Sequence, residues 1–168
     1  MKTYCLDTNC LIDAFKPESS FYEAMKRILS AYKAGALRLV VSRHSLSELL
    51  LPLEAVEFAK TLQVVEHYPV GMWQDQICTW KECAGTWDEA RSNAKKLERL
   101  TILAKTGAGI RDKGGYIDAV IAGVEAFVTS DSDLVGAATA QNICNEFKVR
   151  IIHQTELAAM LDSVQEGS

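Results

Sequence analysis

The chain has 168 residues, of which 48% are hydrophobic and 8% aromatic, and its 18 Lys and Arg against 22 Asp and Glu give a net charge of -4. This composition is typical of a globular chain that can bury a core, and it excludes an intrinsically disordered protein. The net charge argues against a broad, positively charged surface that binds nucleic acid, although it is compatible with a local group of basic residues around an acidic site.

The sequence predicts a cytoplasmic protein that does not enter a membrane. No apolar run approaches the roughly 20 residues that a transmembrane helix needs. The acidic residue Asp7 lies too close to the start of the chain to leave room for the apolar stretch of a signal peptide. The five cysteines form no CxxC pair, so we expect reduced and mostly buried thiols and no zinc site.

In the first half of the chain, apolar runs that suit strands alternate with segments of helical spacing. Strands are expected at 3–6, at 37–41 and, more weakly, near 62–66. Helices are expected at 9–15, 21–34 and 53–62. A further helix is expected to begin at Ser42 and to carry Glu48, and Gly35 is expected to end the helix before it.

The second half begins with a long polar-rich segment, 70–106, that we expect to be helical. Its tryptophans Trp73, Trp80 and Trp87 share one helical face, which is more typical of a core or a partner interface than of a base-stacking platform. The glycines between 107 and 115 predict a loop. Later helices are expected at 116–126, 133–146 and 154–162, with strands at 126–129 and 148–152 and a loose tail from Gln165.

Strands that alternate with helices predict an α/β fold with three layers, a parallel sheet flanked by helices. We expect a single domain over residues 1–168, because no linker, repeat or low-complexity segment divides the chain. Ligands bind such sheets at the carboxyl ends of the strands. Asp7 and Asp131 follow predicted strands, and Glu48 and Asp118 lie in helices that can lean over the same edge.

Four short acidic motifs stand at the edges of these apolar runs. They are Leu6-Asp7-Thr8-Asn9, Ser42-x-x-x-x-x-Glu48, Asp118-Ala119-x-Ile121-Ala122 and Thr129-x-Asp131-x-Asp133. Carboxylates that meet at one place repel one another, and a divalent cation is the usual remedy. Oxygen ligands favour Mg²⁺ or Mn²⁺, which activate phosphodiesters and water. Neighbouring polar groups suit the orientation of the carboxylates: Thr8, Asn9, Ser42 and Thr129.

The four motifs, in this order, resemble the PIN domain family, and most of all the VapC-type toxins of bacterial and archaeal toxin–antitoxin systems. The resemblance runs from Asp7 to about Leu161. It implies a metal-dependent endoribonuclease in which Asp7, Glu48 and Asp118 form the acidic core. It further implies Asp131 as the fourth acid and Asp133 as an additional one. An RNA substrate, an antitoxin protein and a homodimer are the implied partners.

Three further residues near the motifs have candidate roles. Arg111 and Lys113 precede Asp118 and are candidates for contacts with RNA phosphates, although solvated loop charges are the plainer reading. His44 lies four residues before Glu48 and is expected either on the surface or orienting that carboxylate. The aromatic segment 70–90 and the glycine-rich loop before Asp118 depart from compact toxins, so the substrate and the partner stay open.

Each acid taken alone has a simpler structural explanation: a strand terminus for Asp7, an ordinary helix residue for Glu48, a helix charge for Asp118, and a turn and cap for Asp131 and Asp133. Two other functions stay open. The first is a non-catalytic PIN-like scaffold that binds RNA or protein. The second is a phosphatase of the haloacid dehalogenase type, which needs an aspartate two positions after the first, where Asn9 stands.

Overall fold

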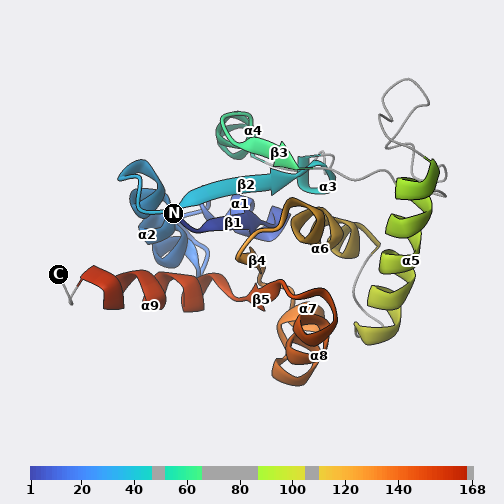
Figure 1. Ribbon diagram of the computed structural model, residues 1–168. Coiled ribbons are helices and arrows are strands. Elements are labelled where there is room, and N and C mark those ends of the chain that lie inside the picture. Colours follow the sequence, from blue (N-terminus) through green and yellow to red (C-terminus); the bar gives the residue numbers. More distant parts are fainter. Residues whose placement is uncertain (47–51, 66–86, 105–109, 166–168) are drawn as a thin grey trace.

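The computed structural model describes residues 1–46, 52–65, 87–104 and 110–165. In these ranges the chain is an α/β protein whose five parallel strands lie in the order β3-β2-β1-β4-β5, with helices on both faces (Figure 1). The strands are β1 (Thr3–Leu6), β2 (Arg38–Ser42), β3 (Gln63–Val65), β4 (Ala126–Val128) and β5 (Arg150–Ile152). The predicted fold class is therefore confirmed. No helix of the described ranges is long and apolar enough to span a membrane.

The central strand β1 is the point at which the strand order reverses. The chain runs outward from β1 to β2 and β3, and it then returns to β4 on the other side of β1. Leu6 pairs in register with Val41 of β2 and with Val128 of β4. The ladder extends one residue further, because the Asp7 N–H donates to the Val128 carbonyl oxygen at 3.0 Å. In open α/β sheets, this switch point is where ligands bind.

Four helices cover one face of the sheet: α1 (Thr8–Asp13), α2 (Tyr22–Lys33), α4 (Leu53–Ala59) and α9 (Gln154–Gln165). Side chains of a strand alternate between the two faces. Leu6, Val41 and Val128 therefore point to this face and pack in one hydrophobic cluster with Met25 and Leu157 of the helices.

The opposite face carries α5 (Trp87–Leu103), α6 (Ile110–Ala122) and α8 (Ala137–Phe147), with the short helices α3 (Arg43–Leu46) and α7 (Ser132–Val135). Cys5, Val40 and Phe127 point to this face. The buried Tyr116 fixes α6 to the sheet, because its hydroxyl donates to the Val149 carbonyl oxygen at 2.7 Å and its ring meets Phe127 edge to face. Asp118 follows two residues later on the same helix.

All five predicted strands are confirmed to within two residues, and most helix predictions agree with the structure. The helices predicted to end at residues 62 and 126 end earlier, at Ala59 and Ala122. Three other details are wrong. Ser42 is the last residue of β2, and the helix begins at Arg43. The helix expected at 133–146 is two helices, α7 and α8, because Gly136 adopts an extended backbone (ψ 126°) between them. Gln165, expected in a loose tail, belongs to α9.

The prediction of a loop at 110–115 is also wrong, because α6 begins at Ile110 and contains Gly114 and Gly115. Glycine is a weak helix former, but it allows another group to approach the backbone closely. The ring of His44 makes such an approach at Gly114. Of the helix predicted at 70–106, the part from Trp87 to Leu103 is confirmed as α5. Trp73 and Trp80 lie outside the described residues.

Candidate active site

Three neighbouring strands are followed by, or end on, a buried polar side chain at the carboxyl edge of the sheet. Asp7 follows β1, Ser42 ends β2 and Thr129 follows β4, and all three side chains are buried. Each lies two residues after a side chain that points to the α6 face: Cys5, Val40 and Phe127. Because side chains alternate along a strand, the three polar groups point to that same face.

Two hydroxyls in this row have the same hydrogen-bonding pattern. Thr129 Oγ1 accepts the Asp131 N–H at 3.0 Å and donates to Asp7 Oδ2 at 2.6 Å. Ser42 Oγ accepts the His44 N–H at 3.0 Å and donates to Asp118 Oδ2. A hydroxyl has a single proton, so the backbone N–H supplies one bond and leaves that proton for the carboxylate. Each strand beside β1 therefore orients one carboxylate.

The carboxylates of Asp7 and Asp118 belong to one site, although they come from different elements. Asp7 is 2% exposed and Asp118 is 1% exposed. Between the sheet and α6 lies the Cys5 thiol, whose pKa is raised well above its usual range by burial, and further by the negative charges of Asp118 and Asp7. Leu6 and Val41 pair in register, so Asp7 and Ser42 stand side by side at the ends of β1 and β2, and Ser42 Oγ in turn contacts Asp118 Oδ2. The structure brings together Asp7, Ser42, Asp118 and Thr129.

This environment predicts that Cys5 is unreactive in the folded protein. The thiolate is the reactive form of cysteine, and burial together with two carboxylates opposes its formation. Cys10 is also buried, whereas Cys144 is half-buried. In iodoacetamide labelling followed by peptide mass spectrometry, Cys144 is expected to react first among these three thiols, and Cys5 and Cys10 only after urea unfolds the chain. Labelling of Cys5 as fast as that of Cys144 would contradict this packing.

Thr8 and Asn9, the polar pair after Asp7, lie in different environments. Thr8 is buried, and its backbone N–H donates to Asp7 Oδ1 at 2.8 Å. With the Thr129 hydroxyl on Oδ2, each oxygen of the Asp7 carboxylate accepts a hydrogen bond. The Asn9 side chain is exposed at the start of α1. The orienting role predicted for Thr8 is thus performed by its backbone.

Asp131 and Asp133 are joined to this site through Thr129. Asp131 caps α7, because its Oδ1 accepts the Asp133 N–H at 2.8 Å. Both side chains are half-buried. Asp131 and Asp133 therefore form the turn and helix cap that their local sequence predicts. Their role in metal binding stays a prediction. Glu48 lies outside the described residues.

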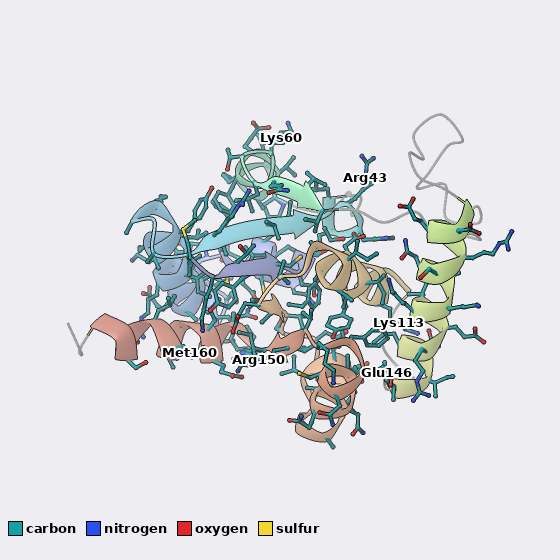
Figure 2. All side chains as sticks on the ribbon, in the orientation of Figure 1. Arg43, Lys60, Lys113, Glu146, Arg150 and Met160 are labelled. Carbon is teal, nitrogen blue, oxygen red and sulfur yellow. The ribbon has the colours of Figure 1, made fainter. Side chains whose placement is uncertain are left out.

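The two basic candidates before Asp118 lie in a helix and not in a loop. Both Arg111 and Lys113 belong to α6. Lys113 is half-buried, and its Nζ lies 3.5 Å from Thr101 Oγ1 of α5, so that its side chain lies between the two helices (Figure 2). Contact with RNA phosphate stays a prediction for both residues.

Four buried residues for which the sequence predicted no role at Asp118 lie on the elements that carry the site: Cys5 on β1, His44 on α3, and Gly114 and Tyr116 on α6. His44 was expected either on the surface or orienting Glu48, and the surface alternative is wrong, since its side chain is only 5% exposed and packs on Gly114. The alternation of a strand was a usable signal for Cys5, which lies two residues before Asp7. No local pattern predicts that α3 packs against α6.

The donor set at this edge fits a hard divalent cation. Mg²⁺ is usually held by one or two carboxylates together with waters, and Mn²⁺ takes similar oxygen ligands. Asp7 and Asp118 supply two buried carboxylates whose orientation is fixed by hydroxyl groups. Among the described residues these two carboxylates form a pair only, since no group of three or more His, Cys, Asp or Glu side chains that could hold a metal is found there.

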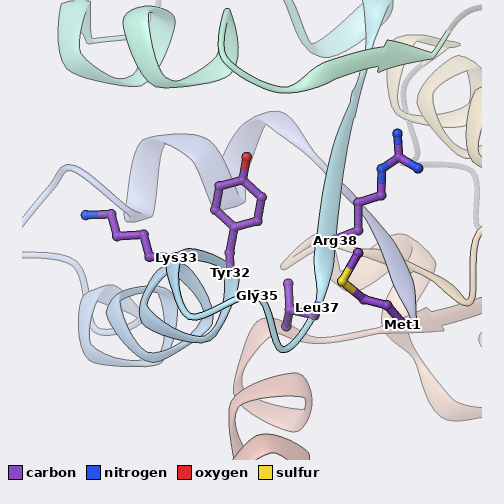
Figure 3. A pocket seen from close by; sticks show the side chains of 6 residues that line it. All are labelled: Met1, Tyr32, Lys33, Gly35, Leu37 and Arg38. Atoms are coloured by element: carbon purple, nitrogen blue, oxygen red, sulfur yellow. The ribbon is translucent and has the colours of Figure 1, made fainter.

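A separate hollow of about 480 Å³ lies at the other end of the sheet. Tyr32 and Lys33 at the end of α2 and Arg38 at the start of β2 help to line it, with Met1, Gly35 and Leu37 (Figure 3). Because parallel strands all run in one direction, the start of β2 is the edge opposite to Asp7 and Asp118. The hollow is therefore distinct from the carboxylate site.

Comparison of the chain with protein-family models and with curated proteins gives no match. The resemblance to PIN domains therefore remains a prediction from the four acidic motifs.

Proposed function

We propose that this chain is a metal-dependent endoribonuclease of the PIN-domain type, which hydrolyses RNA phosphodiester bonds. One observation carries the proposal: two buried carboxylates lie at the switch point of a parallel sheet, each oriented by a hydroxyl group from a strand beside β1. Burying a carboxylate costs free energy unless its charge is compensated, and a bound divalent cation both compensates the charge and can take part in catalysis.

Asp7 and Asp118 would hold the Mg²⁺ or Mn²⁺ ion, with Glu48, Asp131 and Asp133 as the further acids that the motifs supply. When bound, such a cation activates the phosphodiester and the attacking water and stabilises the charge that develops on the phosphate. The role of the neighbouring residues is to orient the two carboxylates that would hold the ion. The Thr8 N–H and the Thr129 hydroxyl fix both oxygens of Asp7, and the Ser42 hydroxyl fixes one oxygen of Asp118.

This preorganisation is what a catalytic carboxylate requires. A carboxylate oxygen that accepts one hydrogen bond keeps a second lone pair for a cation. Ligands that are already oriented need no rearrangement when charge develops in the transition state. Burial under α6 also excludes bulk water from one side of the carboxylates, which strengthens their electrostatic interactions.

The proposed biological setting is the cytoplasm, with the chain acting as the toxin of a toxin–antitoxin pair and forming a homodimer. These parts of the proposal rest on the motif resemblance. The sequence pI of about 5.4 is compatible with an antitoxin whose contact segment is basic. Arg111 and Lys113 are proposed to contact RNA phosphates beside Asp118.

The test of the proposed function is RNA cleavage by the purified chain at controlled metal concentration. We expect cleavage with Mn²⁺ or Mg²⁺, its complete loss when a chelator removes the metal, and its return when excess Mn²⁺ is added. A metal-independent activity would contradict the proposal. Mn²⁺ binding without cleavage of any RNA would instead favour the non-catalytic scaffold.

A further inference from the structure

A steric contact joins α3 to α6 beside the proposed active site. A Cβ atom added to Gly114 would lie 2.8 Å from both Cε1 and Nε2 of His44 and 3.0 Å from its Cδ2. The imidazole ring therefore occupies the space that any side chain at position 114 would need. His44 and Gly114 are both buried, so the His44 ring cannot rotate toward solvent unless the packing between the two helices opens.

A second contact, at Asp118, joins α6 to the end of β2, the strand that leads directly into α3. Gly114 lies four residues before Asp118 in α6, which places both on one face of that helix. His44 lies two residues after Ser42, and its backbone N–H donates to Ser42 Oγ at 3.0 Å. Ser42 Oγ donates in turn to Asp118 Oδ2. The segment from Ser42 to His44 therefore contacts α6 at two points: the His44 ring lies against Gly114, and the Ser42 hydroxyl donates to the Asp118 carboxylate.

We infer that Gly114 and His44 are positioning residues for Asp118. The ring at Gly114 sets how closely α6 approaches α3, and this approach sets the reach of Asp118 to Ser42 and to the edge where Asp7 stands. The inference rests on the proposed function and extends it to two residues that act through Asp118. Glycine is present at position 114 for this approach, at the expense of helix propensity.

Gly114→Ala and Gly115→Ala form a matched pair of variants that tests the inference. Both add one methyl group to adjacent positions of α6, and both raise helix propensity equally. At Gly115 the new Cβ would meet Phe127 Cζ at 3.5 Å and Ser42 Cβ at 3.7 Å, which are ordinary contacts. We expect Gly114→Ala to lower Mn²⁺ affinity and the kcat of RNA cleavage about tenfold or more, as for other groups that orient metal ligands. Gly115→Ala should leave both unchanged.

The double variant His44→Ala with Gly114→Ala separates positioning from general damage. Once the ring is gone, the added methyl group has room, so Gly114→Ala should cost no further Mn²⁺ affinity in the His44→Ala background. If Gly114→Ala alone does not fold, the Mn²⁺ affinity of the double variant can still be compared with that of His44→Ala. Lowered thermal stability of Gly114→Ala with wild-type Mn²⁺ affinity and kcat would overturn the inference and leave a packing contact only.

The failure of this inference is distinguishable from the failure of the proposed function. If the wild-type chain binds Mn²⁺ and cleaves no RNA, the endoribonuclease proposal is wrong, and Mn²⁺ affinity alone still decides the role of the pair. Equal loss of Mn²⁺ affinity from Gly114→Ala in the presence and in the absence of the His44 ring would overturn the inference whatever the RNA result.

Discussion

Replacement of Asp7 or Asp118 with Asn is expected to lower RNA cleavage by about 100- to 1,000-fold, the scale seen when one electrostatic group of an active site is removed. Asn keeps nearly the same shape, and its carbonyl oxygen can still accept the hydroxyl hydrogen bond from Thr129 or Ser42. What is lost is the negative charge that the cation needs. The effect should therefore appear in Mn²⁺ affinity and in kcat/KM, while thermal unfolding shows that the variants stay folded.

Asp162→Asn is the matched control for this prediction. Asp162 lies on α9, where its exposed carboxylate pairs with Arg27 at 2.7 Å. Exposed ion pairs contribute little to stability, so the same chemical change should leave both the fold and the cleavage rate unchanged. The control also reports contamination by another ribonuclease, because a contaminant would cleave RNA equally in all three preparations. Full activity of Asp7→Asn would contradict the proposed role of this residue.

The second large effect is expected from the hydroxyls of Thr129 and Ser42, which orient the two carboxylates through hydrogen bonds. Thr129→Val and Ser42→Ala should each weaken Mn²⁺ binding or cleavage by about 10- to 100-fold, the usual cost of losing a group that orients a metal ligand. Valine keeps the shape of threonine without its hydroxyl proton, so Asp7 Oδ2 loses the hydrogen bond from Thr129 that helps to orient it. Thr129→Ser keeps the hydroxyl and should restore most of the binding.

Loss of a hydroxyl also affects stability, and the experiment must separate the two effects. The Asp131 N–H loses its acceptor in Thr129→Val, and a polar group left unsatisfied in this way costs about 1–3 kcal/mol. Denaturant unfolding measures that loss, and calorimetry at temperatures where the variant stays folded measures Mn²⁺ affinity. Thr155→Val provides the control, since Thr155 is exposed in α9. Mn²⁺ affinity of Thr129→Val equal to that of wild type would show that Asp7 needs no such support.

The parallel sheet and most of the polar row at its edge could be predicted from the sequence, for a physical reason. Apolar runs such as 3–6 and 126–129 bury both faces of a strand, and helices between them force the strands to be parallel. Parallel strands end at one edge, so residues that follow them must gather there. Asp7 and Thr129 therefore share that edge whatever the details of the helices.

The parts that could not be predicted depend on which helices touch. Gly114 and Gly115 have low helix propensity, and local reasoning assigns them to a loop. Their place inside α6 is decided by the packing of that helix on the His44 ring and on Phe127. The same packing buries His44. Asp131 shows a different limit, because a cap and a metal ligand have the same local sequence, and only the bond to the Asp133 N–H reveals the cap.

The most direct test of the carboxylate site is Mn²⁺ titration calorimetry on the wild-type chain, Asp7→Asn, Asp118→Asn and Asp162→Asn. We expect wild type and Asp162→Asn to bind Mn²⁺ with the same affinity, and Asp7→Asn and Asp118→Asn to lose most of that binding while remaining folded. Equal Mn²⁺ affinity in all four proteins, or no Mn²⁺ binding by the wild-type chain, would contradict a metal site built on Asp7 and Asp118.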